Sequence, residues 1–232
     1  MNTALKCDNL CKNYNGFQAL INVNLELNRG RIVGLLGPNG SGKTTLIKLI
    51  NGLLTPSSGN IQIAGNPVGV ESKKIVSYLP DKTYLPLNQT VEQVIAFFMN
   101  FYQDFDRKKA GTMLRNLSIE PSMKLKNMSK GTLEKVQLIL VMSRQAQLYV
   151  LDEPIAGVDP AAREFILRTI IQNYSENATV LISTHLISDI EPVLDDVLFL
   201  KNGSIVLNST VDEIREQNNM SVDGLFREVF RC

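Results

Sequence analysis

The sequence has 232 residues, enough for one or two domains with a substantial core. Its 44% hydrophobic and 20% charged residues are ordinary for a soluble globular protein, and no stretch reaches the roughly 20 apolar residues of a membrane-spanning helix. The 24 basic residues are balanced by 23 acidic ones, so the net charge of +1 gives no reason to expect nucleic acid as a partner.

The N-terminus and the cysteines bear on location. Residues 1–6 lack the charged-then-apolar layout of a secretion signal. Cys7, Cys11 and Cys232 are odd in number and have no second cysteine pair or nearby histidine for a metal site. We therefore expect reduced thiols that act as small apolar residues, in a cytoplasmic protein that reaches a membrane only by docking there.

The first third of the chain alternates short apolar strands with turns rich in Gly and Asn. An apolar run between Gly30 and Gly37 has the character of a strand covered on both faces. From Lys43 the apolar residues recur at helical spacing, and this helix is expected to stop at Gly52. The strands predicted in this part are 5–10, 20–27, 31–36, 60–64 and 75–79.

Strand character is absent from residues 81–146, where a helical insertion is predicted. Thr90 and Gln93 form a capping box at the start of its first helix. The periodicity of apolar residues predicts two more helices, over 106–116 and 130–145.

Strands return at 148–151 and 179–183, separated by a helix for which Asp159 is the N-cap and Pro160 the first residue. The order strand, helix, strand implies a parallel sheet with right-handed crossovers. A hairpin over 197–200 and 204–207 is predicted to turn at Asn202-Gly203, and two short helices follow it.

Residues 37–44 read Gly-Pro-Asn-Gly-Ser-Gly-Lys-Thr, directly after a predicted strand and before a predicted helix, which is the setting of a phosphate-binding loop. The glycines let successive N–H groups converge on a phosphate, and the helix N-terminus adds its dipole. Lys43 supplies a full charge to the β- and γ-phosphates, and the Thr44 hydroxyl suits Mg²⁺. The Asp-x-x-Gly and Asn-Lys-x-Asp patterns of GTPases do not occur, so ATP is the expected nucleotide.

The strand 148–151 is followed by two acidic residues, Asp152 and Glu153. The carboxyl ends of parallel strands face the ligand crevice, so both side chains can reach a bound phosphate. We expect Asp152 to hold Mg²⁺ through a water, and Glu153 to orient or deprotonate the attacking water. Alone, such a pair could equally begin a turn; its position downstream of a complete phosphate loop favours the catalytic interpretation.

With these motifs placed, residues 5–207 resemble the ABC ATPase family. The family's signature segment has a Ser-Gly-Gly core, and here Ser129 and Gly131 match it while Lys130 departs from it. The resemblance implies that this segment contacts ATP held by a second subunit, so that two subunits enclose two nucleotides. Lys130 either adds a charge near that phosphate or points to solvent.

Further positions match the family. His185, the only histidine, follows the strand 179–183 and resembles the switch histidine that contacts the γ-phosphate, although a lone histidine is more often structural. Residues 157–160 resemble the loop that crosses the dimer interface, where Asp159 would also be a good N-cap. Tyr14 matches the aromatic residue that stacks on adenine; a core tyrosine is the alternative.

One departure concerns the residue after the strand 75–79. The family usually has Gln there, touching Mg²⁺ and relaying motion to the helical insertion, whereas this chain has Asp81. Aspartate can still accept from a metal-bound water, but it adds a charge and has a shorter reach. Asp81 lies where the membrane partner docks in the family, together with Phe97, Phe98, Phe101 and Tyr102, some of which must be ordinary core residues.

The resemblance implies an α/β fold with a P-loop NTPase core, a mixed sheet, an N-terminal antiparallel subdomain and a helical insertion. We expect one ABC ATPase domain over 1–232, with a core formed by 1–80 and 147–208, a helical subdomain over 81–146 and C-terminal helices over 209–232. The implied site residues are, for catalysis, Glu153, His185 and Lys43; for ATP, Tyr14, Gly37, Pro38, Asn39, Gly40, Ser41, Gly42, Lys43, Thr44, Thr45, Asp81, Ser129 and Gly131; and for Mg²⁺, Thr44, Asp152 and Asp81.

The function implied is an ATP-hydrolysing transport subunit that works with a second cassette and a separate transmembrane subunit, on the cytoplasmic face of the membrane. The sequence at residues 78–81 and 129–131 resembles that of a bacterial ABC-2-type exporter branch, which favours export. One alternative is a soluble ABC ATPase acting on DNA or ribosomes, but such proteins usually have a long coiled-coil insertion, zinc-binding cysteines or two cassettes. Another is a regulatory subunit that binds ATP and barely hydrolyses it.

Overall fold

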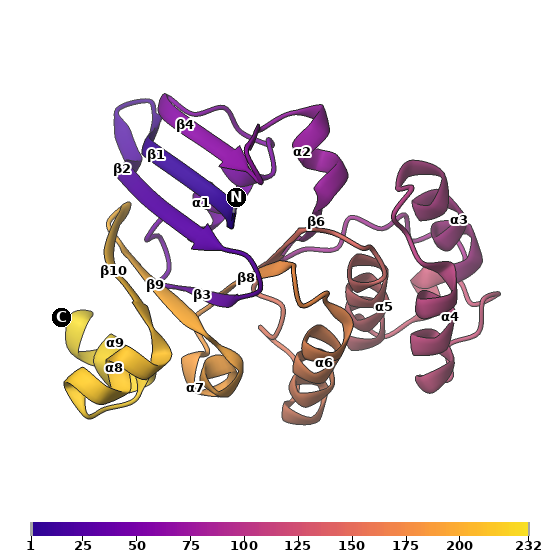
Figure 1. Cartoon of the computed structure of the whole chain (residues 1–232). Helices are drawn as coiled ribbons and strands as arrows, with labels where there is room; N and C mark the ends of the chain where they lie inside the picture. The colour runs from indigo at the N-terminus through magenta and orange to yellow at the C-terminus, as the bar shows by residue number, and fades with distance from the viewer. Residues whose placement is uncertain (1, 232) are drawn as a thin grey trace.

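The computed structural model describes residues 2–231 and contains two sheets with helices around them (Figure 1). The first sheet is antiparallel, has four strands in the order β2-β1-β4-β5, and begins with a long hairpin. From Val23 to Asn28, buried and exposed residues alternate along β2, as expected of a sheet with one face on the core and one exposed. The strands are β1 (Thr3–Tyr14), β2 (Phe17–Asn28), β4 (Ser58–Ile63) and β5 (Asn66–Pro67).

The second sheet has six strands in the order β10-β9-β3-β8-β7-β6. All neighbours are parallel except β9 and β10, which are antiparallel. Both faces are covered, so all residues of β3 and β7 are buried. The strands are β3 (Ile32–Leu36), β6 (Val76–Leu79), β7 (Leu148–Asp152), β8 (Thr179–Thr184), β9 (Asp196–Lys201) and β10 (Ser204–Thr210).

The helices divide between the two sheets and the insertion. Helix α1 lies between the sheets, α6 to α9 lie on the other face of the second sheet, and α3 and α4 are at the far end of the molecule beyond α5 (Figure 1). Their bounds are α1 (Lys43–Ile50), α2 (Val70–Ile75), α3 (Val91–Phe101), α4 (Arg107–Asn116), α5 (Lys130–Met142), α6 (Pro160–Asn173), α7 (Ile187–Ile190), α8 (Val211–Asn218) and α9 (Val222–Val229), with 3-10 turns η1 (Leu125–Asn127) and η2 (Glu191–Val193).

Three hydrophobic clusters follow from this layout. Side chains of β3 alternate between two of them: Val33 and Leu35 face α1 and the first sheet, whereas Ile32 and Leu36 face the helices on the other side. The third cluster belongs to the helical insertion and includes Phe98. Helix α5 contributes side chains both to the cluster that contains Ile32 and Leu36 and to the cluster of the insertion. It therefore joins the insertion to the main core.

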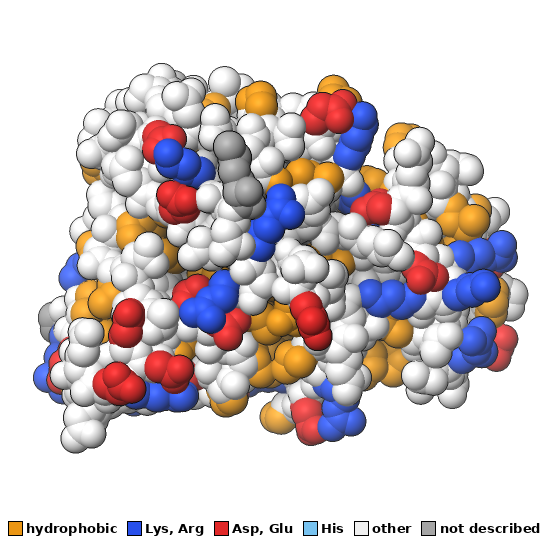
Figure 2. Space-filling model, in the orientation of Figure 1, with side chains coloured by type: hydrophobic (Ala, Val, Ile, Leu, Met, Phe, Trp, Pro, Cys, Tyr) orange, Lys and Arg blue, Asp and Glu red, His pale blue; other side chains and the backbone are white. Residues whose placement is uncertain are grey.

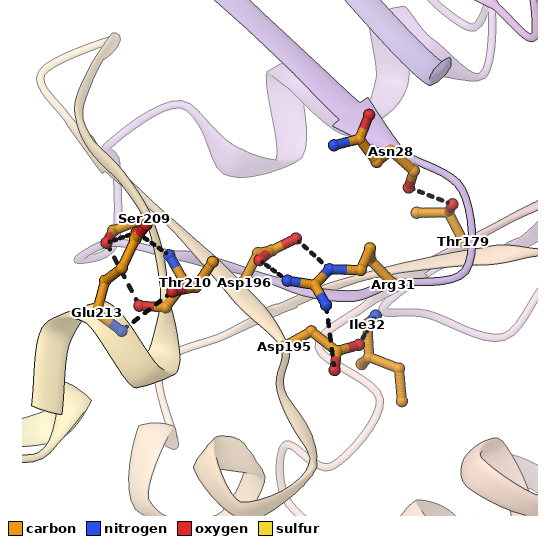
Figure 3. A network of polar contacts seen from close by, with 9 residues as sticks. All are labelled: Asn28, Arg31, Ile32, Thr179, Asp195, Asp196, Ser209, Thr210 and Glu213. Carbon is orange, nitrogen blue, oxygen red and sulfur yellow. Dashed lines mark hydrogen bonds and ion pairs between the residues drawn. The ribbon is translucent and has the colours of Figure 1, made fainter. Parts of the chain in front are cut away.

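Polar contacts hold the beginnings of the sheet strands together (Figure 3). The Arg31 guanidinium donates to both carboxylate oxygens of Asp196, at 3.0 and 2.8 Å, and the Ile32 N–H donates to the Asp195 carboxylate at 2.7 Å. The Thr179 hydroxyl donates to the Asn28 carbonyl at 2.8 Å. On the face shown in Figure 2, acidic and basic side chains are interspersed. None of the helices within residues 2–231 is long and apolar enough to cross a membrane.

The local signals in the sequence were largely confirmed. The Thr90–Gln93 capping box and the Asp159 N-cap are present. The hairpin turns at Asn202-Gly203, both with positive φ, as a type I′ turn requires. Both helices after the hairpin are present as well.

Several predicted boundaries were wrong. The helix expected over 130–145 ends at Met142, because the chain turns after Ser143 to bury Arg144 against Asp104. The strand expected from residue 75 begins at Val76, since Ile75 closes helix α2, which the sequence analysis missed together with α7. The first two strands are longer than predicted, because the hairpin continues to Tyr14 and Phe17.

Candidate active site

The phosphate loop lies between β3 and α1 and is packed tightly against the N-terminal sheet. Gly42 has φ of +109°, and a Cβ atom there would lie 2.7 Å from the Ala19 carbonyl oxygen, so only glycine fits. The Lys43 ammonium folds back onto the loop and donates to the carbonyls of Gly37, at 2.7 Å, and Pro38, at 3.3 Å. Burial lowers the Lys43 pKa, an effect opposed by Glu153 and Asp152.

The loop offers groups that suit a phosphate. The Ser41 hydroxyl is buried and has no hydrogen-bond partner among the described residues. An orphaned buried hydroxyl is costly unless a ligand oxygen completes its bonding. Thr44 is exposed in the first turn of α1, Thr45 follows half-buried, and Asn39 and Gly40 are exposed on the loop. These residues therefore fit a phosphate group held at the start of α1.

A serine that the sequence analysis did not select organises the acidic pair. Strands β7 and β8 are parallel, with Asp152 opposite Ser183. The Ser183 hydroxyl donates to Asp152 Oδ1 at 2.6 Å and accepts the Glu153 N–H at 3.1 Å. Its position two residues before His185, at the end of the neighbouring strand, was the only signal for it in the sequence.

Asp152 is almost completely buried, and its Oδ2 atom has no partner within the described part of the chain. Burial raises the Asp152 pKa; the Ser183 hydrogen bond and Lys43 oppose this, while Asp81 and Glu153 reinforce it. A free carboxylate oxygen beside a lysine and a phosphate loop suits a hydrated Mg²⁺, which keeps several waters and takes few protein ligands. Residues 2–231 contain no group of three or more His, Cys, Asp or Glu side chains that could hold a metal ion.

Glu153 begins the loop after β7 and has a strained backbone, with φ of +51°. Such a conformation costs about 1–2 kcal/mol for a non-glycine residue. It is held by two acceptors for the Glu153 N–H, the Ser183 carbonyl and hydroxyl. The Glu153 carboxylate lies 3.0 Å from Nδ1 of His185, whose side chain is half exposed. The predicted base and the predicted switch histidine are therefore in direct contact.

These groups face one cavity of about 720 Å³. It is lined by the phosphate-loop residue Asn39, by Asp81 after β6, by the ends of β7 and β8, and by Lys130 at the start of α5. Asp81 is exposed, and its negative charge acts on Asp152 and on Tyr78, whose pKa burial raises. Asp81 thus shares a cavity with the predicted catalytic residues.

Other predicted site residues lie outside that cavity. Tyr14 is 41% exposed at the tip of the β1–β2 hairpin, paired in register with Phe17, and the Lys12 ammonium is 5.2 Å from its ring centre. It is therefore a surface aromatic, and the core alternative is wrong. Ser129 is exposed and caps α5 by accepting the Thr132 N–H at 3.2 Å; a Cβ atom on Gly131 would meet nothing within 4 Å.

The aromatic residues of the insertion divide into core and surface. Phe98 is buried in the helical cluster, and the ring of Tyr102 stacks beneath the Arg144 guanidinium at 3.8 Å. Phe97 and Phe101 are 48% and 68% exposed, with ring centres 4.4 Å apart. Phe98 and Tyr102 also line a cleft of about 550 Å³ between the insertion and the core, which Asp81 borders as well.

The sequence of this chain is similar to those of known proteins over most of its length. The profile of a family described as ABC transporter matches residues 20–156. The ABC transporter ATP-binding protein YxlF of Bacillus subtilis (strain 168), described as uncharacterized, is 30% identical over 223 residues, which cover 94% of this chain and 75% of YxlF.

Solved structures are similar in fold over nearly the whole chain. The ATP-binding subunit of an ABC transporter superposes with a TM-score of 0.88 at 30% identity, covering 99% of this chain and 100% of that one. A dimeric post-hydrolysis state of the cassette MJ0796 bound to ADP and Pi has a TM-score of 0.78 at 22% identity, with coverage of 89% and 98%. The expected fold is therefore confirmed.

Proposed function

Because the chain belongs to the ABC transporter family, as an ATP-binding protein, we propose that it hydrolyses ATP to drive transport through a separate membrane-spanning subunit. The observation that carries this proposal is the contact of 3.0 Å between the Glu153 carboxylate and His185, at the edge of the cavity that the phosphate loop borders. A regulatory subunit that only binds ATP would not need a positioned carboxylate and imidazole there.

The residues of this chain divide the work of hydrolysis. ATP with Mg²⁺, when bound, supplies the phosphoanhydride and a Lewis acid. Lys43 exchanges its carbonyl partners on the loop for phosphate oxygens and neutralises their charge. Glu153 accepts a hydrogen bond, and then a proton, from the attacking water, while His185 holds the carboxylate in place. A positioned base of this kind contributes about 10²–10⁴ in rate.

A second copy of the cassette completes the site. Ser129 and the open space beside Gly131 are exposed and lie outside the chain's own cavity. The helix N-terminus there suits a phosphate presented by another subunit. Lys130, 80% exposed and 3.8 Å from Glu134, adds a positive charge beside it and also lines this chain's own cavity. We extend to this chain the dimeric arrangement of the ADP- and phosphate-bound cassette of the same fold.

The membrane partner would dock at the cleft between the insertion and the core. Asp81 borders both this cleft and the catalytic cavity, so it can relay the state of one to the other. The exposed rings of Phe97 and Phe101 offer apolar surface on the same insertion. Docking there places the chain on the cytoplasmic face of the membrane. The sequence at residues 78–81 favours export as the direction of transport.

The decisive experiment compares Glu153→Gln with Glu134→Gln, which alters a carboxylate in the same cavity that contacts Lys130. Purified proteins are assayed for phosphate release with Mg²⁺ and ATP, and for binding of a fluorescent ATP analogue. Glu153→Gln should lower turnover by at least about a hundredfold and leave nucleotide binding intact, while Glu134→Gln should retain most activity. A wild-type chain that binds ATP but turns it over no faster than Glu153→Gln would support the regulatory alternative instead.

Asp81→Ala tests the relay. Loss of the carboxylate should lower Mg²⁺-dependent turnover, or uncouple turnover from transport when the membrane subunit is present. Unchanged turnover and transport would reject a role for Asp81. Pull-down of the chain with membrane proteins from its native cell tests the separate partner.

A further inference from the structure

A second polar cavity, of about 560 Å³, lies at the N-terminal ends of the parallel strands of the six-stranded sheet, whereas the candidate active site lies at their C-terminal ends. Its lining includes Arg29 in the turn between β2 and β3, Gln147 directly before β7 and Ala178 directly before β8, whereas Asp152 and Ser183 are at the other ends of their strands. Its volume is within the range of small-molecule sites. No residue to which a nucleotide or catalytic role has been given lines it.

The walls of this cavity contain more positive than negative charge. Arg29, Lys109 and Arg144 line it, and no aspartate or glutamate does. The Arg144 guanidinium is already matched by a bidentate contact with Asp104, at 3.0 and 3.1 Å. Arg29 and Lys109 form no ion pair with any carboxylate among residues 2–231.

Arg29 is incompletely bonded. One terminal nitrogen donates to the Gln147 side-chain oxygen at 3.0 Å, but the Nε atom is buried and has no hydrogen-bond partner in the described chain. Arg31, two residues further along, shows the contrast: both Asp195 and Asp196 lie beside its guanidinium (Figure 3). A buried donor on a charged group is costly to leave unbonded, so Arg29 lacks an acceptor.

Lys109 reaches the same cavity from the first turn of α4. Its ammonium donates to the carbonyl of Asn173 at the C-terminus of α6, which leaves two of its N–H donors available. Burial lowers the Lys109 pKa, and Asp106, whose carboxylate caps α4, opposes this only partly. An anion between Lys109 and Arg29 would offset the burial of both charges.

We propose that this cavity binds a small phosphate-bearing anion between the Arg29 guanidinium and the Lys109 ammonium. The other terminal nitrogen of Arg29, which bonds no residue among 2–231, can donate to a phosphate oxygen, and the Lys109 ammonium adds a point charge. The amide side chains of Gln145 and Gln172 on the same walls can donate to the remaining oxygens. Because Lys109 belongs to the helical insertion and Arg29 precedes β3, the anion bridges the two parts and restrains the insertion.

The test titrates inorganic pyrophosphate into the chain by calorimetry, with the phosphate loop first saturated by a non-hydrolysable ATP analogue. One binding event is expected, weakened about tenfold or more in Arg29→Gln and in Lys109→Gln, since charged hydrogen bonds are lost. Lys108→Gln, which alters the adjacent, exposed lysine of α4, should bind like the wild type. No turnover is measured, so the outcome is independent of the proposed hydrolysis.

A second measurement needs no substitution. Backbone amide NMR signals of the nucleotide-saturated wild type should shift on adding pyrophosphate at residues 145–147 and 172–177, and not at 37–45. Absence of binding, binding as tight as the wild type by Arg29→Gln and Lys109→Gln, or shifts confined to 37–45 would overturn the proposal. Tighter binding of citrate than of pyrophosphate would overturn the assignment to phosphate.

Discussion

We expect Asp104→Asn to destabilise the protein by about 3 kcal/mol, because it leaves a buried arginine without its counter-ion. The Arg144 side chain is 3% exposed and donates to both Asp104 oxygens. The same guanidinium also donates to the carbonyls of Lys74, at 2.6 Å, and Val76. These carbonyls remain in the variant, so the expected cost is at the lower end of the about 3–5 kcal/mol found when a buried pair loses one partner.

The consequence extends beyond one ion pair. Asp104 belongs to the helical insertion, and the Arg144 carbonyl accepts the Tyr149 hydroxyl of β7 at 2.5 Å. Arg144 therefore ties the insertion to the strand that ends at Asp152. For a chain of this size, each kcal/mol lowers the melting temperature by about 2–4 °C, so a decrease of about 6–12 °C is expected.

Urea unfolding followed by far-UV circular dichroism measures this, since the chain contains no tryptophan. The matched control is Glu164→Gln, which removes the partner of Arg168 at a similar distance of 2.8 Å but with side chains 74% and 64% exposed. Exposed pairs contribute about 0–1 kcal/mol, so little change is expected there. Equal destabilisation by the two substitutions would refute the reasoning that burial, and not distance, sets the cost.

Three other predictions concern the active site. Ser183→Ala removes the hydrogen bond that lowers the Asp152 pKa, so that pKa should rise further and half-maximal ATPase activity should need more Mg²⁺; an unchanged Mg²⁺ titration would contradict this. Asp152→Asn should stabilise the nucleotide-free chain at pH 7, because folding raises the Asp152 pKa above its ordinary value of 3.8 and therefore penalises the ionised carboxylate. Below about pH 3.8 the carboxyl is protonated in both the folded and the unfolded chain, so this penalty disappears. Thermal melts of variant and wild type should therefore converge at that pH. Gly42→Ala should abolish binding of a fluorescent ATP analogue, since its Cβ atom would lie 2.7 Å from a backbone oxygen. Gly65→Ala, outside the phosphate loop, has φ of +81° and nothing within 4 Å of the added Cβ, so it should cost about 1–2 kcal/mol of stability and retain binding; equal loss of binding in both variants would contradict the argument that the clash at Gly42 is responsible.

Much of the candidate site could be predicted because its parts are contiguous in the chain. The phosphate loop needs glycines at positive φ, a lysine and a helix start, and all of these are adjacent. The acidic pair follows directly from its strand. Ser183 was missed because its role depends on β8 lying beside β7 in a register that sets it opposite Asp152, 31 positions away.

Boundaries failed where distant contacts overrode a local pattern. The predicted helix extended to residue 145, yet α5 ends at Met142 because Arg144 is drawn toward Asp104 and the Lys74 carbonyl before β6. Tyr14 shows the opposite case. Nothing in its neighbours distinguished a surface ring from a core ring until the hairpin placed it at an exposed tip.

The sequence by itself determined the caps, the hairpin turn, the phosphate loop and the acidic pair, because each depends on hydrogen bonds and steric limits within a few residues. Only the tertiary structure decided the order of strands, the contact between Glu153 and His185, and the cationic cavity beside Arg29. These depend on which buried faces pack together, and hydrophobic periodicity shows that a face is buried without specifying what covers it.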